Sequence, residues 1–275
     1  MLPGGWVMLK HRAALAATDR IVADPARRRL LQGLLRAMGL SVVGAGAGCE
    51  SEGRWFGRPS VQLPAPLPVP WTMKALATAT TQMRTLADGR LYLHIRHDIL
   101  RGVTPRMLVW WFSHLEGDIE VAGRRWPRYR VWHPVDHIAV RYVRRRPDGS
   151  IGPGAQIHIR EALGGRLEDL VDVVTTIEKL DETGFVHGLR LLGMEIMRLA
   201  YSFTPVAGGT LYENSIIFGP DNMLRPSFNT VLRPRLLPDD RARAWLKHNV
   251  EEVGNFEHFL PGLYARETAA RAASR

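Results

Sequence analysis

Hydrophobic and polar positions alternate along the middle of the chain, from Tyr129 to Phe218. This part is rich in β-branched and aromatic residues, and glycine-containing turns interrupt it at 148–149, 164–165, 182–184 and 208–209. A period of two residues between such turns is typical of antiparallel strands joined by hairpins. We therefore predict an antiparallel sheet over this region.

Helices are expected on both sides of these strands. Thr104-Pro105 is a typical N-cap followed by a proline at the first helical position, and it predicts a helix with its body at 107–114. The residues 238–240 (Pro-Asp-Asp) open a long helix, which we expect to end near Phe259 because a proline and a glycine follow at 261–262. A sheet followed by one long helix predicts an α+β fold, in which a curved sheet grips the helix.

The N-terminal stretch has the pattern of an export signal. Arg27-Arg28-Arg29-Leu30-Leu31-Gln32 resembles a twin-arginine motif, 34–43 is a short apolar run, and 45–49 resembles a lipoprotein cleavage box. The box ends at Cys49, the single cysteine of the chain. We expect an exported protein of the cell envelope with a possible lipid anchor at Cys49. Arg36 and Gly46 depart from the usual pattern, so a cytoplasmic protein with an N-terminal amphipathic helix stays an alternative.

A second alternative for this stretch is a cofactor-binding loop, because 44–48 reads Gly-Ala-Gly-Ala-Gly. A dinucleotide-binding turn needs G-x-G-x-x-G followed by a helix. Here Cys49 stands at the third glycine position, and a proline-rich stretch follows instead of a helix. We therefore do not expect a nucleotide cofactor.

Composition and pattern together predict five parts. Residues 1–49 are the export signal, and 50–70, with five prolines after position 58, form an extended linker. Residues 71–125 are expected to be an N-terminal helical segment, 126–265 the catalytic helix-grip domain, and 266–275 a tail. The N-terminal part is thus a small appendage to one main domain.

The net charge of +10 does not indicate a nucleic-acid partner. Residues 1–49 carry half of it, and +5 on the remaining 226 residues is ordinary for a soluble surface. The dense basic run Arg141–Arg146 leads into a turn and is better explained as a hairpin tip. A single cysteine also excludes internal disulfides and cysteine-based zinc sites.

A carboxylate in the strand region is the first chemical clue. If 156–161 is a strand, Glu161 shares the inner face with Ile157 and Ile159, while His158 and Arg160 face outward. A buried carboxylate needs a metal, a cation or a proton. The alternative is that the strand ends at Arg160 and Glu161 faces solvent.

The C-terminal helix supplies a second pair. His248 and Glu252 are four residues apart and therefore neighbours on one helix face, near an apolar stripe that includes Trp245 and Phe256. This is the geometry of a metal-binding half-site, although such a pair also arises often by chance.

The third group is Trp132-His133-Pro134-Val135-Asp136-His137. His133 continues the face of Tyr129 and Val131 if those residues are a strand, and Pro134 then breaks the strand at the rim of a cavity. The alternative is a turn in which His137 is solvated and Asp136 caps the backbone.

Together these residues resemble a known family. The ordered set comprises His94-Ile95-Arg96-His97-Asp98, Arg101 to Phe112, Tyr129 to His137, His248 with Glu252, and Asn255 to Pro261. Over residues 71–264 it resembles the diacetylphloroglucinol hydrolase family, which includes phloretin hydrolase. The resemblance implies a Bet v 1-like helix-grip fold and a Zn²⁺-dependent hydrolase that cleaves a carbon–carbon bond between an acyl group and a phenolic ring. It also implies zinc ligands at His133, Glu161, His248 and Glu252.

The same resemblance implies a small aromatic ketone as substrate and a possible homodimer. Cleavage needs a proton for the ring carbon and groups that hold the phenolic hydroxyls. Candidates for these catalytic roles are His187, Tyr129 and Tyr212, each with core packing as its alternative, and Asp136 for contact with substrate hydroxyls. The competing class of protein is a non-catalytic helix-grip module that binds a hydrophobic ligand.

Overall fold

The computed structural model describes residues 61–191, 193–221 and 228–273. The predictions for residues 1–49, including the export signal and the lipid anchor at Cys49, lie outside these residues. So does the first part of the 50–70 linker. Among the described helices, none is long and apolar enough to cross a membrane.

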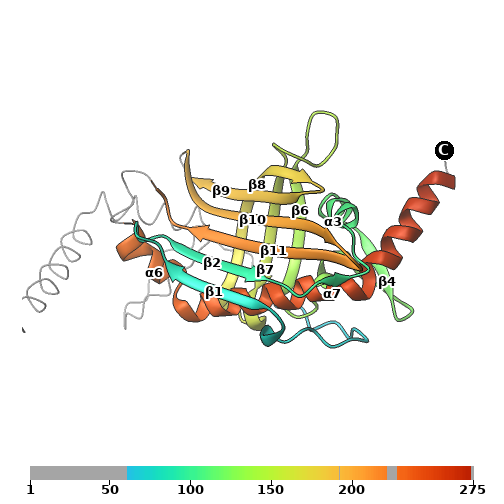
Figure 1. Cartoon of the computed structure of the whole chain (residues 1–275), viewed down its shortest axis with the longest axis horizontal. Helices are drawn as coiled ribbons and strands as arrows, with labels where there is room; N and C mark the ends of the chain where they lie inside the picture. The colour runs from blue at the N-terminus through green and yellow to red at the C-terminus, as the bar shows by residue number, and fades with distance from the viewer. Residues whose placement is uncertain (1–60, 192, 222–227, 274–275) are drawn as a thin grey trace, which may run out of the picture. The chain divides into compact units, whose positions relative to one another are not determined.

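An antiparallel sheet is the main element, and its described part has nine strands (Figure 1). The order is β1-β2-β11-β10-β9-β8-β7-β6, and the short β3 pairs with β11. A separate two-stranded sheet pairs β4 with β5. The bounds are β1 (Thr80–Thr85), β2 (Leu91–Arg96), β3 (Leu100–Arg101), β4 (Asp118–Val121), β5 (Arg124–Pro127), β6 (His137–Arg144), β7 (Gln156–Ala162), β8 (Leu170–Asp181), β9 (Gly184–Leu191), β10 (Met194–Val206) and β11 (Gly209–Phe218).

The described residues form few helices, and one dominates. They are α3 (Pro105–Phe112), α4 (Arg128–Trp132), α6 (Arg233–Leu236) and α7 (Asp239–Ala273), with short helical turns η1 (Leu76–Thr78), η2 (Leu163–Gly165), η3 (Leu167–Asp169) and η4 (Phe228–Leu232). The predicted cap of α3 is confirmed, because the Thr104 side chain accepts a hydrogen bond from the Met107 amide at 3.3 Å.

The sheet buries one face against α7, as the alternation in the sequence predicts. Along β11 every second residue is buried, from Thr210 to Phe218. Their partners on α7 include Val253 and Phe256, which belong to the same hydrophobic core as Tyr212. A buried hydrogen bond of 2.6 Å from Asn214 to Asn249 ties β11 directly to α7. The architecture is therefore a helix-grip fold, an antiparallel sheet holding a long C-terminal helix (Figure 1).

The predicted end of the long helix is wrong. The helix does not stop before Pro261 but continues through it to Ala273. Proline removes one hydrogen bond within a helix, and the last turns compensate with tertiary contacts. Leu263 is buried in the core, and Glu267 pairs with Arg128 at 2.7 Å. The expected tail from 266 onward is therefore helical as far as Ala273.

The predicted helical segment over 71–125 also differs from the structure. Only α3 is a helix of more than one turn there, while β1 and β2 extend the main sheet beyond β11. Leu91, Leu93 and Ile95 of β2 are buried on the face shared with α7. The strands of this region therefore belong to the same fold as the rest of the sheet.

The described end of the proline-rich linker is packed against the domain. We call residues 61–74 the strap. Its Leu67 is buried and donates a backbone hydrogen bond to Pro134 at 3.0 Å, and Trp71 donates to Asn255 of α7 at 3.0 Å. Proline keeps the segment extended, as expected, but these contacts make it part of the folded body instead of a free spacer.

Candidate metal centre

Three elements bring histidines and carboxylates together inside the fold. The turn after α4 carries His133 and Asp136, and His137 begins β6. Glu161 lies on β7, and α7 carries His248, Glu251 and Glu252. All seven side chains are at most 14% exposed. So many titratable groups in one buried place need a common partner, because unpaired buried charges are very unfavourable.

Two histidines and two carboxylates of this cluster lie especially close together. The Nε2 atom of His137 lies 3.5 Å from Glu161 Oε1 and 3.3 Å from Glu252 Oε2. The Nε2 atom of His248 lies 3.6 Å from Glu161 Oε2 and 3.7 Å from Glu252 Oε2. Zinc binds nitrogen and oxygen at roughly 2.0–2.2 Å, which places tetrahedral ligand atoms about 3.3–3.6 Å apart. His137, His248 and Glu252 therefore form one close group that could hold a metal ion, and Glu161 lies beside it, contacting the two histidines through different carboxylate oxygens.

The hydrogen bonds of the two histidines direct a lone pair toward the two carboxylates. His137 Nδ1 lies 2.6 Å from the Tyr129 carbonyl oxygen, which can only accept, so the proton of the neutral ring is on Nδ1. His248 Nδ1 faces an Asp136 carboxylate oxygen at 2.9 Å. In both rings Nε2 is left for a metal, and the buried His137 Nε2 has no hydrogen-bond partner in the described structure.

His133 has the opposite arrangement. Its Nδ1 accepts a hydrogen bond from the Asp136 amide at 3.0 Å, so the neutral ring carries its proton on Nε2. That Nε2 points to Glu251, 3.4 Å away, and to Asp136, 3.7 Å away. His133, Asp136 and His248 do form one close group of potential ligands, beside the group of His137, His248 and Glu252. The Nε2 atoms of both His133 and His137 lack a hydrogen-bond partner among the described residues, so the two rings differ in the tautomer that the Asp136 amide and the Tyr129 carbonyl impose on them.

The electrostatics of the metal-free cluster agree with this arrangement. Burial, and then the neighbouring His248, lower the pKa of His137, so its ring is neutral. Burial would also lower the pKa of His248, but Glu252 and Glu161 outweigh it and raise that pKa to about 9. Without a metal, His248 is therefore protonated, and its Nε2 proton lies between the carboxylates of Glu161 and Glu252. A metal ion would replace that proton at the same place.

Tyrosine side chains surround the cluster. The Tyr129 hydroxyl donates to Glu161. Tyr201 and Tyr212 pack against each other at a ring-centroid distance of 5.9 Å, and burial, followed by Glu252 for Tyr201 and by Tyr201 for Tyr212, raises the pKa of each phenol well above its usual value. The Tyr212 hydroxyl is buried and has no hydrogen-bond partner among the described residues. It is therefore a protonated donor available to a bound molecule.

His187 lies in the same layer of rings. Its Nδ1 is 2.8 Å from the Thr175 hydroxyl, and its Nε2 is 3.4 Å from the Tyr201 hydroxyl. Burial lowers the pKa of His187 to about 3. The ring is therefore neutral near pH 7 and acts as a hydrogen-bonding group, not as a stored proton.

The sequence-based site residues can now be placed. Glu161, His248 and Glu252 lie close together, and His133, Asp136 and Tyr129 lie around them. His187 and Tyr212 line the layer of rings next to them. As predicted, His158 and Arg160 lie on the other face of β7, where both contact Asp172 of β8.

The sequence reasoning missed His137 as a candidate ligand, and also Tyr201 and Glu251. His137 belongs to the quoted motif, but a turn with a solvated histidine was its only interpretation. His137 follows Tyr129 by eight residues, and this spacing could have indicated that His137 is a candidate ligand. The spacing is informative only when residues 128–132 are known to form the helix α4.

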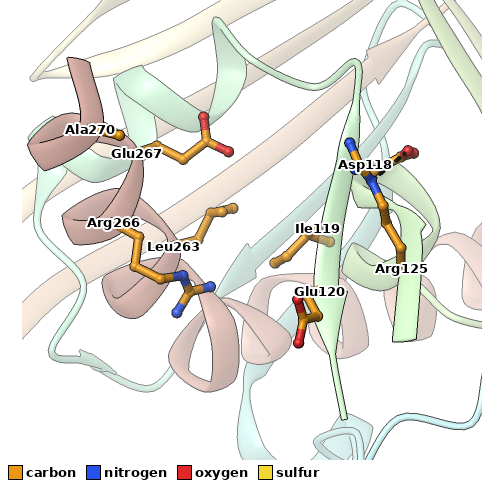
Figure 2. Close-up of a pocket in the computed structure, with 8 residues that line it drawn as sticks. All are labelled: Asp118, Ile119, Glu120, Arg125, Leu263, Arg266, Glu267 and Ala270. Carbon is orange, nitrogen blue, oxygen red and sulfur yellow. Dashed lines mark hydrogen bonds and ion pairs between the residues drawn. The ribbon is translucent and has the colours of Figure 1, made fainter. Parts of the chain in front are cut away.

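A separate groove lies far along α7 from this cluster. It encloses about 530 Å³ between the β4–β5 hairpin and the C-terminal turns of α7, with Ile119, Leu263 and Ala270 among its lining residues (Figure 2). Its charged side chains are largely paired, as in the 3.2 Å contact of Arg125 with Asp118. None of the residues of the metal cluster lines it.

Fold and site together define a helix-grip protein with a buried cluster of histidines and carboxylates that can hold a metal ion. Residues 79–171 match the family model of the DAPG hydrolase PhiG domain. The resemblance to that family is thereby confirmed over a segment that contains Tyr129, His133, Asp136, His137 and Glu161. No curated protein matches the chain by sequence.

Several solved structures are similar to the chain at low sequence identity. A START superfamily protein from Mycobacterium smegmatis is 12% identical over 62% of this chain and 97% of its own, with a TM-score of 0.39. Ara h 8.0201 is 14% identical over 62% and 96%, with a TM-score of 0.38. CalU16 from Micromonospora echinospora is 12% identical over 64% and 96%, with a TM-score of 0.31.

Proposed function

We propose that the protein is a zinc-dependent hydrolase that cleaves the bond between an acyl group and a phenolic ring, as in an acylphloroglucinol. The observation that carries the proposal is the close group of His137, His248 and Glu252, with the Glu161 carboxylate 3.5 Å from His137 through one oxygen and 3.6 Å from His248 through the other. The match of residues 79–171 to the DAPG hydrolase model supports the reaction class.

The reaction consumes one water molecule. Water adds to the acyl carbon, the carbon–carbon bond breaks, and the ring carbon takes a proton, so the products are a phenol and a carboxylic acid. A bound zinc ion would supply Lewis acidity to polarise the ketone oxygen. Glu161 and Glu252 would hold it with the two histidines, and Tyr129 would fix the orientation of the Glu161 carboxylate through its hydrogen bond.

The remaining groups suit a phenolic substrate. The unpaired Tyr212 hydroxyl can donate to a ring hydroxyl, because burial raises its pKa well above the usual value and keeps it protonated. Tyr201 and His187 are joined at 3.4 Å and form a pair that can pass a proton toward the ring. The stacked rings of Phe185 and His187 offer a flat wall for an aromatic molecule.

The test combines metal content and turnover in the full-length protein. We expect about one zinc per chain, and hydrolysis of an acylphloroglucinol, in the wild type. The His248→Ala variant should lose both, and His158→Ala, on the outer face of β7, should keep both. A wild-type protein that binds no metal and does not hydrolyse the substrate, together with a Glu161→Gln variant that folds and binds the same ligand, would replace the proposal by the non-catalytic ligand-binding class.

The N-terminal pattern adds a proposal about location. The twin-arginine motif and the box ending at Cys49 support export to the cell envelope. Mass determination of Cys49 in the native protein is the direct test: a lipid adduct supports the anchor, and an unmodified, uncleaved N-terminus supports the cytoplasmic alternative.

A further inference from the structure

Asp136 is held by the chain in an unusual way. Its side chain is 3% exposed, and both carboxylate oxygens accept hydrogen bonds from the protein. Oδ1 accepts from the Gly165 amide and Oδ2 from the Gly164 amide, each at 3.0 Å. Oδ2 also faces His248 Nδ1 at 2.9 Å. Both oxygens of this carboxylate therefore already accept hydrogen bonds from the protein. This arrangement does not fit the predicted contact of Asp136 with substrate hydroxyls.

The two glycines that hold Asp136 are conformationally special. Gly164 and Gly165 are consecutive residues with φ of 66° and 68°, a backbone region that glycine adopts far more readily than other residues. A Cβ on Gly165 would lie 3.2 Å from the Val135 side chain, so the turn also packs closely against the segment that carries Asp136. The turn follows β7 directly, three residues after Glu161.

We infer that Asp136 is a positioning residue that orients His248 toward the metal, and that the Gly164–Gly165 turn fixes Asp136 for this purpose. The inference rests on the proposed metal site. The Gly164–Gly165 turn then links two ligands on different elements. It follows β7, which carries Glu161, and it holds Asp136, which orients the His248 ring of α7. Metal-ligating histidines commonly donate their second N–H to a carboxylate, which fixes the ring and its tautomer.

Replacing Asp136 by Asn tests the arrangement without changing the size of the side chain. Three N–H groups converge on two acceptor oxygens, and an amide keeps only one of these oxygens. An amide nitrogen at the Oδ1 position opposes the Gly165 amide and loosens the turn that holds residue 136; at the Oδ2 position it opposes the Gly164 amide and His248 Nδ1, and the ring then turns away or moves its proton to Nε2. Either change removes Nε2 from the metal. We expect Asp136→Asn to weaken zinc binding about 10- to 100-fold.

The matched control is Asp172→Asn. Asp172 contacts His158 at 2.5 Å on the outer face of the sheet, so this variant removes a His–carboxylate pair that has no metal beside it. A second pair tests the turn: Gly165→Ala should weaken zinc binding, while Gly149→Ala has a similar φ of 77°, no neighbour within 4 Å of its new Cβ, and should not. If the Asp136→Asn variant does not fold, the comparison of Gly165→Ala with Gly149→Ala still tests the inference.

The readouts are the zinc dissociation constant from chelator competition and the visible spectrum of the Co²⁺-loaded protein, which reports ligand geometry. A weaker Kd and an altered spectrum in Asp136→Asn and Gly165→Ala, with unchanged controls, support the inference. An unchanged Kd and spectrum with a raised KM would overturn it and make Asp136 a substrate contact. A wild-type protein that binds neither metal would instead remove the proposed function, and the inference with it.

Discussion

His137 donates from Nδ1 to the carbonyl oxygen of Tyr129 at 2.6 Å, and the two rings stack at a centroid distance of 3.9 Å. These contacts hold the ring so that its Nε2 faces Glu161 and Glu252. His133, four residues earlier, accepts from the Asp136 amide through Nδ1, and its Nε2 lies 3.4 Å from Glu251. The two histidines therefore have different expected roles.

The pair gives a direct test of the ligand set. We expect His137→Ala to lose most of the bound zinc, because it removes one of the four proposed ligand side chains. His133→Ala should lower stability, since the ring is 1% exposed, but it should retain zinc. Metal content by plasma mass spectrometry after dialysis decides between them. The reverse result would restore His133 as the ligand.

Tyr212 and Tyr142 form a second matched pair. The Tyr142 hydroxyl accepts from the Leu115 amide and donates to the Phe112 carbonyl, whereas the Tyr212 hydroxyl has no partner in the described structure. Tyr142→Phe should cost about 1–3 kcal/mol of unfolding free energy, because it leaves buried backbone groups unpaired.

Tyr212→Phe should cost no stability, but it should lower kcat/KM for a hydroxylated aryl ketone at least about tenfold if the hydroxyl binds substrate. Urea unfolding and steady-state kinetics measure the two effects. A Tyr212→Phe variant with unchanged kinetics would show that this tyrosine only packs.

The pH dependence of stability should report on His97. This ring is buried, donates a hydrogen bond from Nε2 to Asn214 Oδ1 at 3.0 Å, and lies near Lys74 and His94. Burial lowers the pKa of His97 from 6.5 to about 4. The unfolded chain therefore takes up a proton first as the pH falls, and stability is full above about pH 6.5 and decreases toward pH 4.

The expected loss from His97 is on the order of 3 kcal/mol over that window. His97→Gln keeps a hydrogen-bonding amide without the titration, so its unfolding free energy should fall less between pH 7 and pH 4.5. The half-exposed His94, replaced by Gln, serves as the control and should leave the wild-type dependence intact. Equal pH dependence in wild type and His97→Gln would contradict the assignment.

The strap provides a prediction about the region before the catalytic domain. Trp71 donates to Asn255 and stacks on His258 at 5.2 Å, and Asn255 in turn donates to the carbonyl of Trp132, next to His133. Trp71→Ala should therefore lower the unfolding free energy by about 2–4 kcal/mol and speed zinc loss to a chelator. A free linker would show neither effect. Leu76→Ala, at an exposed position, is the control.

The elements with strong local patterns could be predicted from the sequence. The capped start of α3, the outward face of His158 and Arg160, and the pairing of His248 with Glu252 on one face of α7 follow from periods of two or 3.6 residues. The family resemblance supplied the order of the motifs and the helix-grip fold.

The turn before β6 could not be predicted in the same way. Tyr129 and Val131 alternate with polar residues and suggest a strand, but they lie in the five-residue helix α4. Such a short helix has too few residues for its period to be visible, and tertiary contacts decide it. Because these residues form a helix and not a strand, His137 lies on the inner side. The alternation expected of a strand had selected His133 instead.

The continuation of α7 beyond Pro261 could not be predicted for a similar reason. A proline and a glycine indicate a helix end locally, but the pairing of Glu267 with Arg128 and the burial of Leu263 come from residues distant in sequence. Long-range contacts of this kind are not visible in the local pattern.

The proposed metal site formed by His137, Glu161, His248 and Glu252 would also link metal supply to folding. These groups come from three elements that meet only in the native chain, so an ion that binds them binds the folded state alone. The free metal concentration then enters the folding equilibrium as RT ln(1 + [M]/Kd), about 2.7 kcal/mol at one hundred times Kd. With zinc as the proposed metal, we expect the amount of folded protein to depend on zinc availability and a chelator to act on this chain as a mild denaturant.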